Sequence, residues 1–256
     1  MLRNFIKRTQ VILLAILLST GCGLLPNFKS NPSSNAESAV LYMEMGARYL
    51  DMGMLDIAKE KLDVAVKLDS SNPDIHNTIG VFYEHIKDYP QAKDSYDTAL
   101  RKGPDNYAIQ SNVGRFYCQR GDFNRGVQLL QQALDAPMNS HQWFAYSNMG
   151  LCYETQKDLQ KAEEYFRKAL QLQPEFPPAL QEMQKISYEN RQYMSARAFL
   201  ERFLSVSQHT PESLWIAFQT ERALGNSSGA QEYGELYINS YPATDEADQI
   251  RTVLGR

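Results

Sequence analysis

The sequence of 256 residues is poor in the residues that most often carry metal or covalent chemistry, with three cysteines, four histidines and two tryptophans. It also lacks a basic excess, because 26 Lys and Arg stand against 30 Asp and Glu, for a net charge of −4. Proteins that hold nucleic acid by its phosphates need a basic face, so nucleic-acid binding is disfavoured. With 43% hydrophobic and 22% charged residues, the composition is that of a globular protein and excludes a disordered or polytopic membrane chain.

No hydrophobic run is long enough to span a membrane. Residues 11–18 form an apolar run of eight, whereas a spanning helix needs roughly 20 apolar residues. The run follows a positive segment with no acidic residue, which contains Arg3, Lys7 and Arg8. This arrangement is typical of an export signal, and it predicts a signal peptide over residues 1–21.

The small residues before Cys22 resemble the lipobox of bacterial lipoproteins. The resemblance implies that Cys22 is acylated and becomes the mature N-terminus. One departure is that Leu18 lies four residues before the cysteine, where the family usually places leucine three before. An ordinary signal peptide with a coincidental cysteine is the alternative. Gly23, in place of aspartate, implies by the same resemblance an outer-membrane location facing the periplasm.

Residues 22–38 are rich in serine, asparagine and proline and show no helical periodicity. Such a composition favours a flexible chain over a packed element. We therefore expect a lipidated tether over residues 22–38 that connects the membrane to a folded body.

Beyond residue 38 the sequence repeats with a period of 34 to 36 residues. Four units share, in order, a glycine, a tyrosine, a small residue, a large apolar residue and an alanine; in the first unit these are Gly46, Tyr49, Ala58, Leu62 and Ala65. The glycines of the next units are Gly80, Gly114 and Gly150. Small residues let two antiparallel helices approach closely, and the larger residues fill the space between them. Pro104 and Pro174 end two units, because proline cannot continue a helix.

This pattern resembles the tetratricopeptide repeat, and two degenerate units follow in phase. The resemblance implies an all-α fold, a right-handed superhelical solenoid of about six antiparallel helix pairs. We expect the units at residues 39–72, 73–106, 107–142, 143–176, 177–210 and 211–244. A capping helix over residues 245–256 would cover the apolar end of the stack. The two extra residues of the third unit fall within residues 136–141.

Catalytic patterns are weak throughout the sequence. Residues 225–229 match the G-x-S-x-G nucleophile elbow around Ser227, but that motif needs a preceding strand, and here it falls on an expected helix–helix turn. The histidines have no metal-ligand spacing, and no glycine-rich phosphate loop is present. The sequence therefore predicts no catalytic residue, no metal, no cofactor and no small-molecule substrate. A hydrolase that uses Ser227 is the catalytic alternative.

Cys118 and Cys152 remain once Cys22 is assigned to lipid. An even number of cysteines in the oxidising periplasm favours a disulfide. They lie on the expected first helices of the third and fourth units, which are neighbours in a solenoid. A disulfide is possible there if both side chains face the seam between the two helices. Two buried reduced cysteines are the alternative.

In tetratricopeptide folds the first helix of each unit lines a concave surface. The positions that point into it are all apolar in the first unit: Val40, Met43, Ala47 and Leu50. In the second unit the equivalent positions are mostly polar. We expect these four residues to form a groove for an apolar partner segment, either helix or strand, since apolar grooves accept amphipathic segments. Packing against the tether or simple capping of the solenoid is the alternative.

The lipobox, the tether and six repeats together resemble the PilF/PilW family of type IV pilus pilotins. The stretches Tyr49-Leu50-Asp51-Met52-Gly53 and Tyr188-Glu189-Asn190-Arg191-Gln192-Tyr193 also look like this family. The resemblance implies a non-enzymatic outer-membrane lipoprotein that binds secretin subunits, and other pilus assembly proteins as well, and promotes secretin localisation and multimerisation. The alternative is a scaffold lipoprotein that regulates cell-wall hydrolases or outer-membrane protein assembly.

Overall fold

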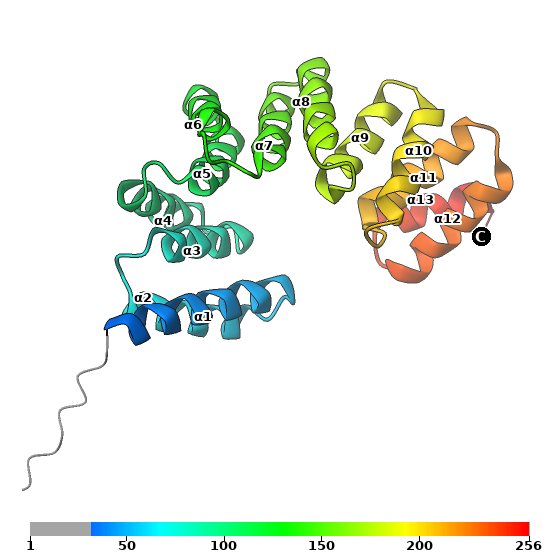
Figure 1. The fold of residues 1–256 in the computed structure, drawn as a ribbon. Coiled ribbons are helices and arrows are strands. Elements are labelled where there is room, and N and C mark those ends of the chain that lie inside the picture. The colour runs from blue at the N-terminus through cyan, green and yellow to red at the C-terminus, as the bar shows by residue number, and fades with distance from the viewer. Residues whose placement is uncertain (1–31, 256) are drawn as a thin grey trace, which may run out of the picture.

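The computed structural model describes residues 32–255, and the regular elements in this range are helices without a strand (Figure 1). The all-α prediction is confirmed. The helices of the first three pairs are α1 Pro32–Asp51, α2 Leu55–Leu68, α3 Pro73–His85, α4 Tyr89–Lys102, α5 Tyr107–Gln119 and α6 Phe123–Asp135. The later helices are α7 Gln142–Thr155, α8 Leu159–Leu172, α9 Pro177–Glu189, α10 Tyr193–Leu204, α11 Pro211–Ala223, α12 Ser227–Ser240 and α13 Asp245–Leu254.

Each odd-numbered helix from α1 to α11 pairs antiparallel with the even-numbered helix that follows it, and small residues set the distance between the two. The pair α3 and α4 shows why, because a Cβ added at Gly80 would lie 2.5 Å from the ring of Tyr96. Tyr96 is fully buried, so its ring occupies the space that the glycine leaves. The repeating glycine of the sequence is therefore a packing residue.

The turn inside each pair contains one residue in the left-handed backbone region. Glycine occupies this position in three turns, with φ of 72° at Gly53, 90° at Gly121 and 71° at Gly225. A larger residue occupies it in the other three turns, with φ of 61° at Lys87, 59° at Lys157 and 59° at Arg191. The next residue caps the following helix in several pairs; Asp88, Asp122 and Asp158 each accept a backbone N–H bond there.

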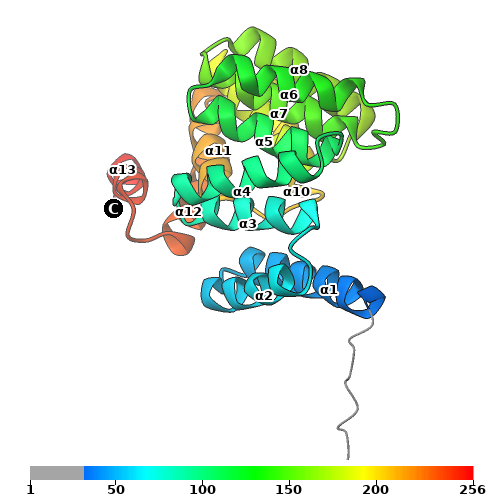
Figure 2. The same cartoon turned by 90° about the vertical axis from the view of Figure 1, so that its left-hand side faces the viewer.

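The pairs stack side by side into an arch (Figure 1), and Figure 2 shows them piled from α1–α2 up to α7–α8. Helices α3 and α5 lie on the inner side of the arch, and α4 and α6 lie on its outer side. Hydrophobic clusters join neighbouring pairs from α1 to α10, as where α8, α9 and α10 share one cluster around Phe166 and Leu180, and a further cluster joins α11 and α12 to α13. Each pair thus shares its core with a neighbouring element, as expected for a solenoid.

The two ends of the solenoid differ from their expected form in one respect. At the C-terminal end, α13 lies where the sequence placed a capping helix, and its Ala247 and Ile250 are buried against the last pair. At the other end, α1 begins at Pro32, so the tether predicted for residues 22–38 is wrong over residues 32–38. Proline is tolerated in the first turn of a helix, and extending an existing helix costs far less than starting one.

Candidate interaction surface

The first odd-numbered helices are joined through one structurally equivalent position near the ends of α1, α3, α5 and α7. We call Leu50, Glu84, Cys118 and Glu154 the joint residues; they are spaced by 34, 34 and 36 residues. Each one reaches the next odd-numbered helix, but each does so with different chemistry.

The first joint is apolar and corrects one of the predicted groove residues. Leu50 is only 5% exposed, and it packs with Ala58, Leu62 and Phe82 in the core between the first two pairs. The prediction that Leu50 lines an open groove is therefore wrong. The reason is that the end of α1 turns its side chain toward α3, where Phe82 covers it.

The second joint is a charged network between α3 and α5. Arg115 donates from both terminal nitrogens to Glu84, at 2.7 Å and 2.9 Å, and the Tyr96 hydroxyl donates to the same carboxylate at 2.7 Å. Burial acts to lower the pKa of Arg115, but the hydrogen bonds and charge of Glu84 outweigh it and raise that pKa. Burial, and then the negative charge of Glu84, raise the pKa of Tyr96. Arg115 therefore keeps its positive charge and Tyr96 keeps its hydroxyl proton, and the bidentate pair holds the network in one geometry because such pairs are strong and directional.

The third joint is covalent. The structure brings Cys118 of α5 and Cys152 of α7 together as a disulfide with a Cα–Cα separation of 5.2 Å. Both residues are buried. Gly126 on α6 makes room for the bond, since a Cβ there would collide with the Cys118 sulfur and lie 2.6 Å from the Gly114 carbonyl oxygen. This explains why the third unit has glycine where the other regular units have alanine.

The fourth joint contains more negative than positive charge. Lys185 of α9 donates to Glu154 of α7, and it also lies 3.7 Å from Glu182 and 3.9 Å from Glu212 of α11. One carboxylate oxygen of Glu182 is buried without a hydrogen-bond partner. Burial, and then the charge of Glu154, raise the pKa of Glu182 to about 7. Burial acts to lower the pKa of Lys185, but the surrounding carboxylates raise it.

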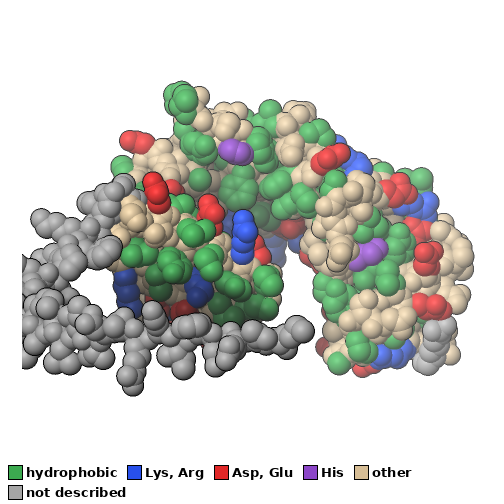
Figure 3. Space-filling view, turned by 60° about the horizontal axis from the view of Figure 1, so that its bottom comes forward, with side chains coloured by type: hydrophobic (Ala, Val, Ile, Leu, Met, Phe, Trp, Pro, Cys, Tyr) green, Lys and Arg blue, Asp and Glu red, His purple; other side chains and the backbone are tan. Residues whose placement is uncertain are grey.

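The remaining predicted groove residues lie on α1 with unequal exposure. Val40 is 37% exposed, Ala47 is half-buried, and Met43 is half-buried against two core clusters. Further exposed apolar side chains surround the first pair, namely Leu41, Met52, Met54 and Ile57. Figure 3, in which the underside of the arch comes forward, shows hydrophobic side chains gathered on both sides of the hollow. The apolar character expected of the first unit is therefore spread over a wider surface than the four predicted positions.

The structure contains neither the nucleophile turn nor a metal cluster among the residues that it describes. Ser227 is the first residue of α12 and follows the helix cap Asn226, so the G-x-S-x-G match is a helix start without the strand that the motif requires. Within residues 32–255, no group of three or more metal-ligating side chains comes together. No helix in the same range is long and apolar enough to cross a membrane. Cys22 and the signal peptide lie outside the described residues.

Two features of the inner surface were not predicted from the sequence. The ion pairs of Glu84 with Arg115 and of Glu154 with Lys185 link residues 31 positions apart on different helices. A hollow also opens where α5 meets α7, beside residues 136–141. The 36-residue step in the repeat was the available signal for this hollow, since it showed where the connecting loop is longer.

Comparison with known proteins places the chain in a family. Residues 143–176 match the tetratricopeptide repeat family, and residues 43–107 and 87–141 match a second form of it, together more than half of the chain. The chain is 26% identical to the type IV pilus assembly protein PilF of Pseudomonas aeruginosa, over 96% of this chain and 98% of that protein.

Two solved structures are similar to the whole solenoid. A structure of Pseudomonas aeruginosa PilF aligns with a TM-score of 0.67 at 25% identity, covering 85% of this chain and 98% of the other. The crystal structure of PilW, described as a widely conserved type IV pilus biogenesis factor, aligns with a TM-score of 0.68 at 25% identity, covering 83% and 97%. The chain therefore belongs to the tetratricopeptide-repeat proteins and is a PilF/PilW-like member of them.

Proposed function

We propose that this protein is a non-enzymatic outer-membrane lipoprotein of type IV pilus biogenesis that binds secretin subunits and promotes their localisation and multimerisation. The observation that carries the proposal is the similarity to PilF, a type IV pilus assembly protein, over nearly the full length of both chains. The similarity to PilW along the solenoid supports the same role. A tetratricopeptide solenoid acts by presenting a curved surface to other proteins, which fits a carrier better than a catalyst.

The first helix pair is the part of the solenoid nearest to the proposed lipid anchor. If Cys22 carries lipid, ten residues from 22 to 31 separate the membrane surface from α1. A fully extended chain of that length spans at most roughly 35 Å. The apolar side chains around α1 would then face a client within that distance of the membrane. Covering an apolar secretin segment there would suppress its premature aggregation.

The capture surface is tested with charge substitutions at residues that the core does not need. Val40→Asp places a carboxylate on the exposed apolar surface of α1, while Leu50→Asp would disrupt the core and is uninformative. Met194→Asp is the matched control, because Met194 is an exposed apolar residue on the distant helix α10. We expect Val40→Asp to lose co-purification with secretin and to reduce secretin multimers, with wild-type helicity. Normal secretin capture by Val40→Asp would refute the assignment of this surface.

The anchor is tested separately with Cys22→Ser. We expect this variant to leave a soluble periplasmic protein, with secretin that is mislocalised or monomeric in fractionated membranes. Secretin multimers that reach the outer membrane normally would count against the proposed role. Recovery of cell-wall hydrolases in place of secretin from wild-type outer membranes would indicate the scaffold role.

A further inference from the structure

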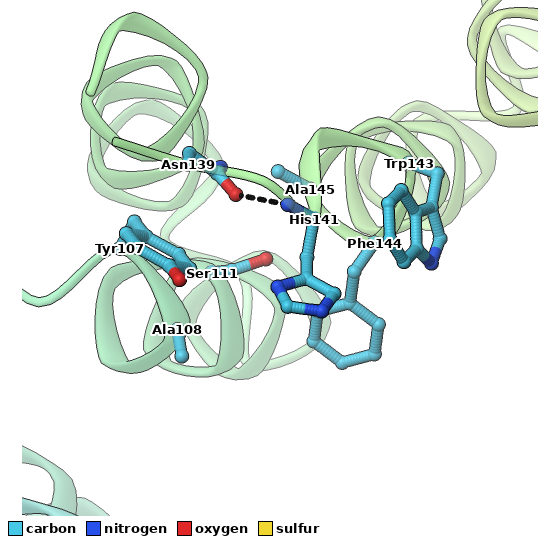
Figure 4. Close-up of a pocket in the computed structure, with 8 residues that line it drawn as sticks. All are labelled: Tyr107, Ala108, Ser111, Asn139, His141, Trp143, Phe144 and Ala145. Carbon is cyan, nitrogen blue, oxygen red and sulfur yellow. Dashed lines mark hydrogen bonds between the residues drawn. The ribbon is translucent and has the colours of Figure 1, made fainter. Parts of the chain in front are cut away.

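A preformed apolar hollow opens at the junction of the third and fourth helix pairs, away from the first pair. It encloses about 380 Å³, and it is lined mainly by Tyr107 and Ala108 of α5 and by Trp143 and Phe144 of α7. Figure 4 shows Tyr107 on the α5 side, Phe144 and Trp143 on the α7 side, and the His141 ring between the two helices. The volume fits one large side chain, which is the scale of a pocket that holds a single anchor residue.

The hollow lies beside the loop before α7, which is longer than the loops at the two neighbouring junctions. Residues 136–141 connect α6 to α7, whereas residues 103–106 connect α4 to α5 and residues 173–176 connect α8 to α9. The longer loop is fixed by Asn139, which donates to the Ala133 carbonyl at 2.7 Å and accepts from the His141 backbone at 2.8 Å. A site that is already ordered costs little conformational entropy when it binds a ligand.

A second hollow with acidic character adjoins the first. The two hollows share Tyr107 and Ala108, and the second one is also lined by Asp74 and Asp105 and by the exposed side chain of Met138. Both aspartates are exposed. In the described part of the chain, neither carboxylate has an ion-pair partner, and Asp74 accepts a side-chain hydrogen bond from Asn106 at 2.9 Å. Two carboxylates without an ion-pair partner in the described residues thus lie beside an apolar pocket.

We propose that this composite surface binds a protein segment in which a large apolar or aromatic residue is next to one or two lysine or arginine residues. The apolar side chain occupies the hollow between Tyr107 and Phe144, and the basic side chains lie against Asp74 and Asp105. Charge complementarity selects the occupant, because an acidic or neutral segment would leave the two carboxylates unpaired at the rim. The surface is separate from the first helix pair, so the proposal does not depend on secretin capture there.

The test uses peptide probes and a fluorescent reporter that the pocket already contains. The chain has two tryptophans, so the Trp215→Phe variant leaves Trp143 in the pocket wall as the sole tryptophan. The probe is a short capped peptide with phenylalanine followed by two arginines. One matched peptide replaces the phenylalanine with alanine, and another replaces both arginines with glutamate. Trp143 emission is titrated with each peptide at low and high salt.

Three variants made in the Trp215→Phe background separate the parts of the surface. Ala108→Arg fills the hollow from an exposed position, and Asp74→Asn with Asp105→Asn removes the charges while keeping the shape. Ala198→Arg is the control, since Ala198 is an exposed alanine on the outer helix α10. All variants are first checked for wild-type helicity by circular dichroism.

We expect the phenylalanine–arginine peptide to bind at least about tenfold more tightly than either matched peptide, and to weaken as salt rises because rim charges are screened. Ala108→Arg should abolish binding, the double asparagine variant should lose the salt dependence, and Ala198→Arg should bind as before. Equal binding of the three peptides, or an unchanged titration with Ala108→Arg, would overturn the proposal. So would a protein dimer that Ala108→Arg dissociates, because the pocket would then serve a second copy of this chain.

Discussion

The buried carboxylate Glu182 leads to a prediction about stability and pH. Its side chain is 18% exposed and lies among Glu154, Lys185 and Glu212, so three carboxylates share one ammonium group. Burial and the charge of Glu154 raise the pKa of Glu182 to about 7 from a reference value of 4.5. The folded protein therefore holds a proton on Glu182 at a pH where the unfolded chain has already released it.

The sign of the effect follows from this difference in proton binding. Below about pH 4.5, Glu182 is protonated in both states and the group contributes nothing to the pH dependence. As pH rises from about 4.5 to about 7, the folded state is progressively destabilised relative to the unfolded chain, because the unfolded chain has released a proton that the folded state still holds. Above about pH 7 the loss is complete. A shift of this size corresponds to at most about 3 kcal/mol in the free energy of unfolding. Glu182→Gln removes the titrating group and hence this loss.

Thermal unfolding followed by far-ultraviolet circular dichroism tests the expectation. Near pH 8, Glu182→Gln should raise the Tm by roughly 5 to 10 °C, since about 3 kcal/mol corresponds to several degrees in a domain of this size. Near pH 5 the gain should be much smaller. Glu212→Gln removes one carboxylate that repels Glu182, so it should also raise the Tm near pH 8, but by less than Glu182→Gln does. The exposed Glu164→Gln is the control for loss of one charge. A gain for Glu182→Gln that is the same at both pH values would refute the reasoning.

Three further substitutions test the packing. Gly126→Ala should lower the free energy of unfolding by about 1 to 3 kcal/mol in urea titrations, because the new Cβ collides with the Cys118 sulfur; a more stable variant would contradict this. Lys157→Gly should raise that free energy by about 1 kcal/mol, since φ of 59° favours glycine, and unchanged stability would show that the turn is not strained. Replacing Cys118 and Cys152 together by alanine should lower stability by about 3 to 4 kcal/mol, as expected for a closed loop of 34 residues. Added reductant should then no longer affect the melting curve, and a remaining effect would contradict that expectation.

The fold could be predicted from the sequence because the same spacing of small and large residues recurs in each regular repeat. Glycine at one position and a large apolar residue sixteen positions later predict a close helix pair, and Gly80 with Tyr96 shows that contact. The spacing of Cys118 and Cys152 placed them on neighbouring first helices, where the structure joins them. These inferences depend on a period that recurs, so a single sequence was sufficient.

Features that depend on one particular contact could not be predicted in the same way. The repeat pattern assigns the position of Leu50 to the concave surface, and only the contact with Phe82 on the next helix shows that Leu50 is buried. The start of α1 was also missed, because the serine- and proline-rich composition of residues 32–38 does not show that a helix behind it extends forward. In both cases the deciding interaction lies outside the repeating pattern.

The joint residues suggest how the solenoid combines rigidity with a varied surface. A solenoid unit touches only its neighbours, so the stiffness of the arch is set at each junction between pairs. Junctions two and three are held by the Glu84–Arg115 network and by the Cys118–Cys152 disulfide, on either side of the helix that carries Ala108. The proposed peptide-binding hollow therefore lies at a junction that is joined covalently. Rigid walls retain their shape when a ligand binds, and this favours a pocket that selects its occupant by fit and charge.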